Sequence, residues 1–139
     1  MTDHLDPTRA QFDVFKNLPR NTPIMMLNLI RFKAQASYED GREMSGRAAY
    51  EIYGEQSAPI FSKLGGEIIW RGEPQSVLIG PQDEHWDMAF IARYPNASAF
   101  LAMVTDPDYK LLVKHRQAAV ADSRLIRMGD LANGSGFAS

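Results

Sequence analysis

The 139-residue sequence contains no cysteine, which excludes disulfides, thiolate nucleophiles and cysteine-ligated zinc or iron–sulfur sites. Its 15 basic and 17 acidic residues give a net charge of −2, so it lacks the basic surplus of a nucleic-acid-binding protein. The longest apolar stretch, residues 24–30, contains Asn28 and is far shorter than the ~20 residues that span a bilayer. No apolar signal segment follows Met1. We therefore expect a cytoplasmic protein that binds neither nucleic acid nor membranes.

Signatures of common catalytic and cofactor sites are missing as well. The sequence has no P-loop, no G-x-G-x-x-G, no G-x-S-x-G and no H-E-x-x-H. Its histidines, at positions 4, 85 and 115, lack the spacing of metal ligands, so we expect no metal and no tightly bound cofactor, haem included. His85 is expected in solvent rather than paired with Asp87, because side chains two apart on a strand are separated by about 7 Å. His115 is expected on the surface, because on a helix it points about 100° away from Arg116.

Hydrophobic periodicity predicts a short initial helix followed by the order β-α-β-β-α-β. Asp6-Pro7 has the pattern of a helix cap and a first-turn proline. The expected strands are residues 24–32, 67–72, 86–94 and 124–129, with 75–79 continuing the second strand past a bulge. The expected later helices begin at Ser45, Asn96 and Asp106. The one that begins at Ser45 is expected to bend before Pro59 and to stop at Gly65.

This order is the split βαβ arrangement of ferredoxin-like folds, an α+β fold in which one antiparallel sheet carries its helices on one face. We expect the domain to cover residues 21–130, after a helical arm at 1–20 and before a flexible tail at 131–139. The predicted strands are apolar on both sides, so a monomer would expose an apolar sheet face. Such a face usually marks an interface, and we therefore expect a homodimer with the two sheets packed face to face.

Several short motifs occur together in an order and spacing that are typical of one protein family. They are Gly65-Gly66, Arg71-Gly72, and Asp106-Pro107-Asp108-Tyr109 with Arg116 seven residues later. Together they resemble the family called domain of unknown function 1330, and segments 26–33 and 49–54 resemble one of its branches. The resemblance covers residues 24–129 and leaves the N-terminal arm outside. It implies membership of the dimeric α/β-barrel superfamily, which includes cofactor-independent monooxygenases, small-ring isomerases, haem enzymes and proteins without an assigned activity.

Three polar residues are candidates for chemistry, and two of them, Arg116 and Asn28, lie where the pattern expects apolar surroundings. Arg116 shares a helix face with Tyr109, and a buried guanidinium needs a partner. Arg71 and Arg116 therefore either grip an anionic ligand or form structural bonds, and we favour the structural interpretation. Asn28 interrupts an apolar strand. It either holds a ligand oxygen or bonds the adjacent backbone, and the two interpretations are equally supported.

Aromatic residues are interpreted first as core and dimer packing and second as walls of a pocket for a flat ligand. The candidate ligand-binding residues are Asn28, Arg71, Arg116, Tyr109, Trp70 and Asp87. Loop 33–45 is long enough to act as a lid. Two functions follow from these residues. One is a cofactor-independent enzyme acting on a small apolar or aromatic molecule with a carbonyl or carboxylate. The other is a non-catalytic ligand-binding or structural homodimer.

Overall fold

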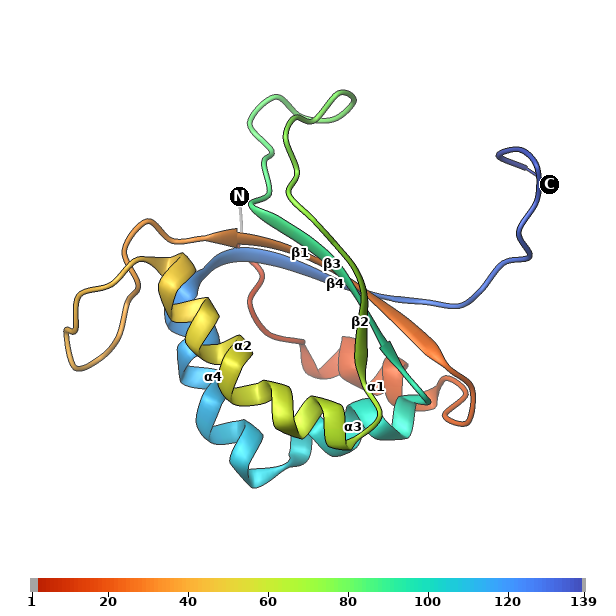
Figure 1. Ribbon diagram of the computed structural model, residues 1–139, viewed down its shortest axis with the longest axis horizontal. Coiled ribbons are helices and arrows are strands. Elements are labelled where there is room, and N and C mark those ends of the chain that lie inside the picture. The colour runs from red at the N-terminus through yellow and green to blue at the C-terminus, as the bar shows by residue number, and fades with distance from the viewer. Residues whose placement is uncertain (1–2, 139) are drawn as a thin grey trace.

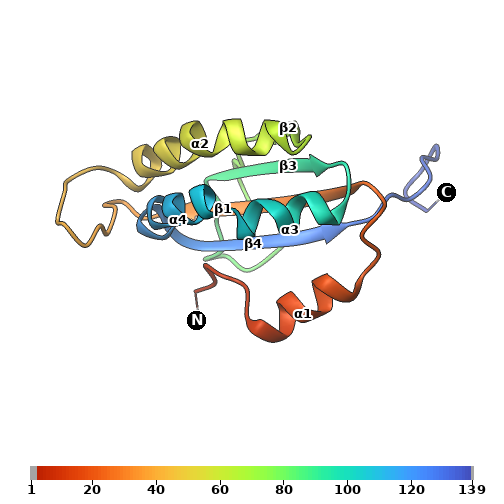
Figure 2. The same ribbon diagram turned by 90° about the horizontal axis from the view of Figure 1, so that it is seen from below.

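The structure is a computed structural model that describes residues 3–138. Its elements are α1 (Arg9–Asn17), β1 (Ile24–Phe32), α2 (Gly46–Lys63), β2 (Glu67–Gly72), β3 (Met88–Tyr94), α3 (Ala97–Thr105), α4 (Pro107–Ala119) and β4 (Val120–Met128). The strands form an antiparallel sheet in the order β2-β3-β1-β4. Helices α2, α3 and α4 cover one face, whereas α1 lies beyond the β4 edge (Figures 1 and 2). The predicted α+β ferredoxin-like fold with an N-terminal helix is therefore confirmed.

Side-chain caps explain where the helices begin. Ser45, Asn96 and Asp106 each accept a backbone amide of the following first turn, which satisfies donors that the helix leaves unpaired. The start of α1 differs from the prediction, because Thr8 rather than Asp6 is its cap. Thr8 and Gln11 form a capping box, in which each residue satisfies the backbone amide of the other.

The end of α2 lies where the sequence predicts it, but the helix shows no interruption at its proline. Gly65 has a φ of +83°, a left-handed conformation that glycine adopts without a steric penalty. Before that point the helix runs through Pro59 to Lys63. The glycine signal and the proline signal thus differ in their effect: helix α2 ends at the glycine but continues through the proline.

Two strand predictions are wrong. Residues 75–79 are not a strand: the pairing of β2 with β3 ends where Gly72 meets Ala89, so no strand remains for a continuation to pair with. The last strand begins at Val120 rather than Arg124. The backbone turns from helical to extended at Val120, and residues 120–123 complete the pairing with the end of β1. No glycine marks this change in the sequence. The helical spacing of apolar residues therefore continues past the true end of α4, and the predicted helix is too long.

The side of the sheet that the helices cover contains two clusters of buried residues. The first core cluster comprises Ile24, Met26, Ala92, Tyr94, Ala97, Phe100 and Met103. The second core cluster comprises Ile30, Ala36, Ala49, Tyr50, Ala118, Ala119 and Val120. Phe90 packs against both, so it lies at their boundary in the middle of the sheet. Burial of such apolar surface is the main stabilising contribution to the fold.

Loop 33–45 is fastened to α4 rather than free. The Ser37 amide donates to the Ala118 carbonyl at 3.0 Å, and the Tyr38 hydroxyl forms a 2.6 Å hydrogen bond with Nδ1 of His115. The expectation that His115 lies on the surface is therefore wrong, since only 6% of it is exposed. The loop covers the part of α4 that helical periodicity assigns to solvent.

Residues 3–6, which we call the N-terminal strap, are bound to β4. The His4 amide donates to Oδ1 of Asp122 at 2.9 Å, and the Ser123 hydroxyl donates to the His4 carbonyl at 2.7 Å. Asp122 and Ser123 are 2% and 5% exposed. These buried polar groups are thus satisfied by a segment that lies more than a hundred residues away in the chain.

Candidate functional site

A row of four side chains crosses the helix-facing side of the sheet, one from each strand. Asn28 lies opposite Phe90 on β3 and opposite Leu125 on β4, and Arg71 on β2 lies opposite Phe90. Directly opposed residues of an antiparallel sheet point to the same side. We call Arg71, Phe90, Asn28 and Leu125 the transverse row. Because Phe90 packs against both core clusters, the row follows their boundary.

The transverse row is less completely buried than its neighbours. Along β1, Met26 and Ile30 are 3% and 0% exposed, whereas Asn28 between them is only half-buried. Leu125 is 43% exposed although it lies on the helix-facing side. Asn28 donates from Nδ2 to the Met26 carbonyl at 3.0 Å. This bond uses one N–H of the side-chain amide, which has a second N–H and an acceptor oxygen as well. The middle of the sheet therefore presents accessible surface with an amide in it.

Two tyrosine hydroxyls meet at the same boundary. The hydroxyl oxygens of Tyr53 on α2 and Tyr109 on α4 are 2.6 Å apart and hydrogen-bonded. Tyr53 packs against the second core cluster and Tyr109 against the first. The aromatic contacts continue from Tyr53 to Tyr50, with ring centres 5.3 Å apart. Helices α2 and α4 thus place phenol groups where the two clusters separate.

Tyr50 and Tyr53 remain neutral at physiological pH. Burial raises the pKa of Tyr50 to about 12, although the nearby charges of Arg116 and Arg71 oppose the shift. Burial, followed by the neighbouring phenols Tyr109 and Tyr50, raises the pKa of Tyr53 well above its ordinary value of 10.0. A neutral phenol donates a hydrogen bond to an oxygen. These groups are therefore suited to stabilising a carbonyl or an anion and unsuited to removing a proton.

The two candidate arginines lie on opposite sides of this region. Arg116 donates to the Leu5 carbonyl of the N-terminal strap and, from Nη2, to the Ser123 hydroxyl at 3.2 Å. Its partners are neutral oxygens, which is the arrangement that a structural role would require. Arg71 is exposed on the edge strand β2, at the end of the transverse row.

Trp70 and Asp87 do not join the other predicted site residues. Trp70 lies opposite Ile91 on the sheet face without helices, which we call the open face, and it is 54% exposed. Asp87 accepts the Phe32 amide through Oδ2 at 2.8 Å and so fastens the end of β1. The fold therefore places Asn28 and Arg71 in the transverse row, and Tyr109 and Arg116 on helix α4. The sequence did not single out Phe90 or Leu125, because only cross-strand register distinguishes them from ordinary core residues.

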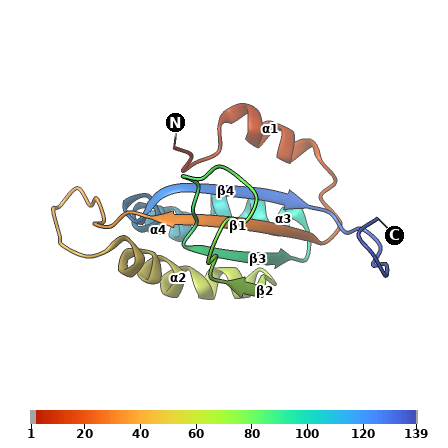
Figure 3. The ribbon, with the colours of Figure 1, turned by 90° about the horizontal axis from the view of Figure 1, so that it is seen from above.

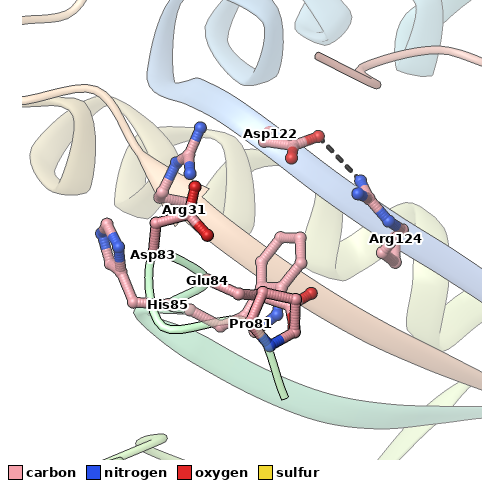
Figure 4. Close-up of a pocket in the computed structure, with 8 residues that line it drawn as sticks. Arg31, Pro81, Asp83, Glu84, His85, Asp122 and Arg124 are labelled. Atoms are coloured by element: carbon pink, nitrogen blue, oxygen red, sulfur yellow. Dashed lines mark hydrogen bonds and ion pairs between the residues drawn. The ribbon is translucent and has the colours of Figure 1, made fainter. Parts of the chain in front are cut away.

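A small pocket on the open face is already filled by its own charges (Figure 4). It has a volume of about 50 Å³, and a water molecule occupies about 30 Å³ of liquid. Arg124 lies 2.8 Å from Asp122 and Arg31 lies 3.7 Å from Asp3. The pocket is therefore too small for an organic ligand.

A wider groove of about 440 Å³ separates α1 from α3. Of its cations, Lys16 is engaged with the Phe12 ring and with Asp13, and Arg20 donates from Nε to the Lys16 carbonyl at 3.0 Å. Among residues 3–138, no three metal-binding side chains gather into a group, and no helix is long and apolar enough to cross a membrane. The transverse row with its tyrosines is thus the place where polar groups and accessible apolar surface coincide.

Comparison with known proteins places the chain in a family. The sequence pattern described as Domain of unknown function (DUF1330) matches residues 42–129, which is more than half of the chain. The chain belongs to the DUF1330 family. The match confirms the resemblance seen in the sequence motifs, and it leaves α1 and β1 of this DUF1330 protein outside the matched range. No match was found among curated proteins.

Solved structures show the same fold. RPA0582 of Rhodopseudomonas palustris, a protein of unknown function, is 52% identical, with a TM-score of 0.90 over 95% of this chain and 100% of that one. The methylated RPA0582 protein aligns with 52% identity and a TM-score of 0.93 over 97% and 100%. SnoaB of Streptomyces nogalater, a cofactor-independent oxygenase, is 13% identical, with a TM-score of 0.50 over 83% and 99%. The last likeness concerns the fold alone.

Proposed function

We propose that this chain binds, at the transverse row, a small molecule with a flat apolar body and a carbonyl or carboxylate group. The observation that carries the proposal is Asn28, a half-buried amide on the central strand between two completely buried residues. A polar group in such a position costs stability unless it is hydrogen-bonded. Phe90 and Leu125 supply apolar surface beside it, and ligand sites combine such surface with a few well-placed polar groups.

The surrounding groups favour a ligand that carries or develops negative charge. Tyr53 and Tyr109 contribute hydroxyl groups, and Arg71 contributes a positive charge at the end of the row. The transverse row and its tyrosines include no histidine or carboxylate, so they supply hydrogen-bond donors without a general base. Such a site stabilises an enolate, a phenolate or a carboxylate.

Chemistry of this kind needs no bound cofactor. The related fold of SnoaB, a cofactor-independent oxygenase, is compatible with a cofactor-independent enzyme. The alternative function, a non-catalytic ligand-binding dimer, uses the same contacts. Oxygen uptake in the presence of an aromatic enol or phenol that is already ionised at the assay pH separates the two, because a binding protein would not accelerate it.

Titration with 4-nitrophenol tests the binding site, because this flat phenol is coloured when ionised. Excess protein should increase the phenolate fraction at fixed pH and lower the apparent pKa of the probe. Asn28→Leu should weaken binding at least about tenfold, or ~1.4 kcal/mol, whereas Asn133→Leu in the exposed tail should bind like the unaltered chain. An unchanged spectrum with the unaltered chain, or equal binding by Asn28→Leu, would contradict the proposal.

We also propose that the chain forms a homodimer through the open face. Register places Trp70, Ile91, Leu27 and Ile126 in one row across that face, and Trp70 and Ile126 are 54% and 45% exposed. Contiguous exposed apolar surface favours association. Sedimentation equilibrium at micromolar concentration should give twice the chain mass. Ile126→Asp should give a monomer, and Leu111→Asp, at a residue 70% exposed on α4, should remain a dimer. A monomeric unaltered chain would contradict this proposal.

A further inference from the structure

The loop between β2 and β3, residues 73–87, extends over the open face, and we call it the arm. It stands on the side of the sheet away from the helices and crosses towards β4 (Figures 1 and 3). Its second half is packed in place: the Arg124 guanidinium lies 5.1 Å from the centre of the Trp86 ring, and Asp87 accepts the Phe32 amide. The arm therefore covers one end of the open face of its own chain.

The tip of the arm is apolar and almost completely exposed. Leu78 and Ile79 are both 93% exposed, and the neighbouring Val77 is 39% exposed. Residues 74–82 contain no charged residue. Single exposed apolar side chains are common on protein surfaces, but three in succession on a projecting loop form a patch that is suited to contact with a partner.

Two features of the arm favour a second copy of this chain as that partner. The arm stands on the open face (Figure 1), where the register places the exposed Trp70 and Ile126, so a copy that meets the open face also meets the tip. The charge of the arm disfavours an anionic membrane, which attracts basic segments. It contains no lysine or arginine and four acidic residues, Glu73, Asp83, Glu84 and Asp87.

The open face offers a complementary place for the tip. The arm covers the end of the face near Trp86, and the far end carries Met128, which is 44% exposed. Arg93 lies opposite Met25 on this end of the face, and Met25 lies opposite Met128. Arg93 lies 3.8 Å from Glu67, so its charge is already paired, and the exposed apolar side chain of Met128 is what this end of the face offers to an apolar tip.

We propose that the tip Val77–Ile79 of each copy docks on the open face of a second copy, at the end near Arg93 and Met128. The proposal rests on the proposed homodimer and extends it, because the two exchanged arms clasp the pair. Each open face is then covered at one end by its own arm and at the other end by the partner's arm.

Sedimentation equilibrium of a Leu78→Asp, Ile79→Asp variant tests the clasp. Both side chains are exposed in the single chain, so the variant should fold with an unchanged circular dichroism spectrum. Its dimer dissociation constant should rise at least about tenfold, whereas Leu111→Asp should leave that constant unchanged. Because the chain has no cysteine, oxidation of a Leu78→Cys, Met128→Cys variant should give a disulfide-linked dimer, and a Leu111→Cys, Met128→Cys variant should not.

The outcomes separate this proposal from the homodimer on which it rests. An unaltered chain that is monomeric overturns both. A dimer that Ile126→Asp dissociates, but that the Leu78→Asp, Ile79→Asp variant leaves unchanged, overturns the clasp alone. Binding of the unaltered chain to phosphatidylglycerol vesicles, abolished by the two aspartates, would assign the tip to a membrane and would also overturn the clasp.

Discussion

Replacement of Arg116 by methionine separates the structural interpretation of this side chain from the ligand-binding one. Methionine keeps much of the apolar stem but removes the bonds to the Leu5 carbonyl and the Ser123 hydroxyl. A hydrogen bond to a charged group contributes about 1.5–3 kcal/mol. Because Arg116 is half-buried and Ser123 still donates to His4, we expect a total loss of about 2 kcal/mol. This is less than the ~3–5 kcal/mol of a broken buried ion pair.

Thermal unfolding followed by circular dichroism measures this loss. With about 2.1 cal/mol/K of unfolding entropy per residue, a chain of this length should lose ~7 °C in its midpoint. Arg116→Lys should lose less, because an ammonium keeps the charge and one bond. Arg9→Met, at an exposed position of α1, is the control and should leave the midpoint nearly unchanged. An Arg116→Met variant that is more stable than the unaltered chain but no longer binds benzoate would refute the structural interpretation.

Further predictions concern glycine and histidine positions. Gly46→Ala should destabilise the chain by about 3 kcal/mol, because its Cβ would lie 2.1 and 2.7 Å from two backbone carbonyl oxygens. In the same helix Gly54→Ala should stabilise the chain by up to ~1 kcal/mol, since no atom lies within 4 Å of the added Cβ. Unfolding midpoints of the two variants that equal that of the unaltered chain would contradict both predictions. Burial lowers the pKa of His115 below 6.5, and the nearby charges of Lys114 and Arg42 lower it further. As the pH decreases, the unfolded chain therefore binds a proton at this residue before the folded chain does. The free energy of unfolding should then fall as the pH decreases from about 6.5. Urea unfolding between about pH 7 and 5 should show a shallower decline for His115→Gln, and an unchanged slope would contradict this assignment.

The fold was largely predictable because its signals are local. The apolar run of β1 marks a strand, and Gly65 after α2 and Gly72 as the last residue of β2 mark element ends, without knowledge of the rest of the chain. The failures occur where a local signal is weak or competes with another. At Val120 the chain changes from helix to strand inside one apolar segment. At the start of α1 the capping box of Thr8 replaces the simpler cap-and-proline pattern.

The candidate site was only partly predictable because it depends on register. Asn28 attracts notice in the sequence as an amide within an apolar run. Its connection to Leu125 is set by pairing between strands almost a hundred residues apart, which periodicity cannot reveal. The same limit applies to His115, whose partner Tyr38 is 77 residues away. A helical wheel describes the helix correctly but has no information about the loop that covers it.

The N-terminal strap has a consequence for how the chain is made. Its hydrogen bond from His4 to Asp122 spans 118 residues. At a synthesis rate of about 5–20 residues per second, Asp122 is added roughly 6–24 s after His4. During that interval the strap has no partner, and the central strand β1 lacks β4 on one edge. The sheet therefore lacks its edge strand β4 until that strand emerges, and the N-terminal strap is among the last segments to find its native contacts.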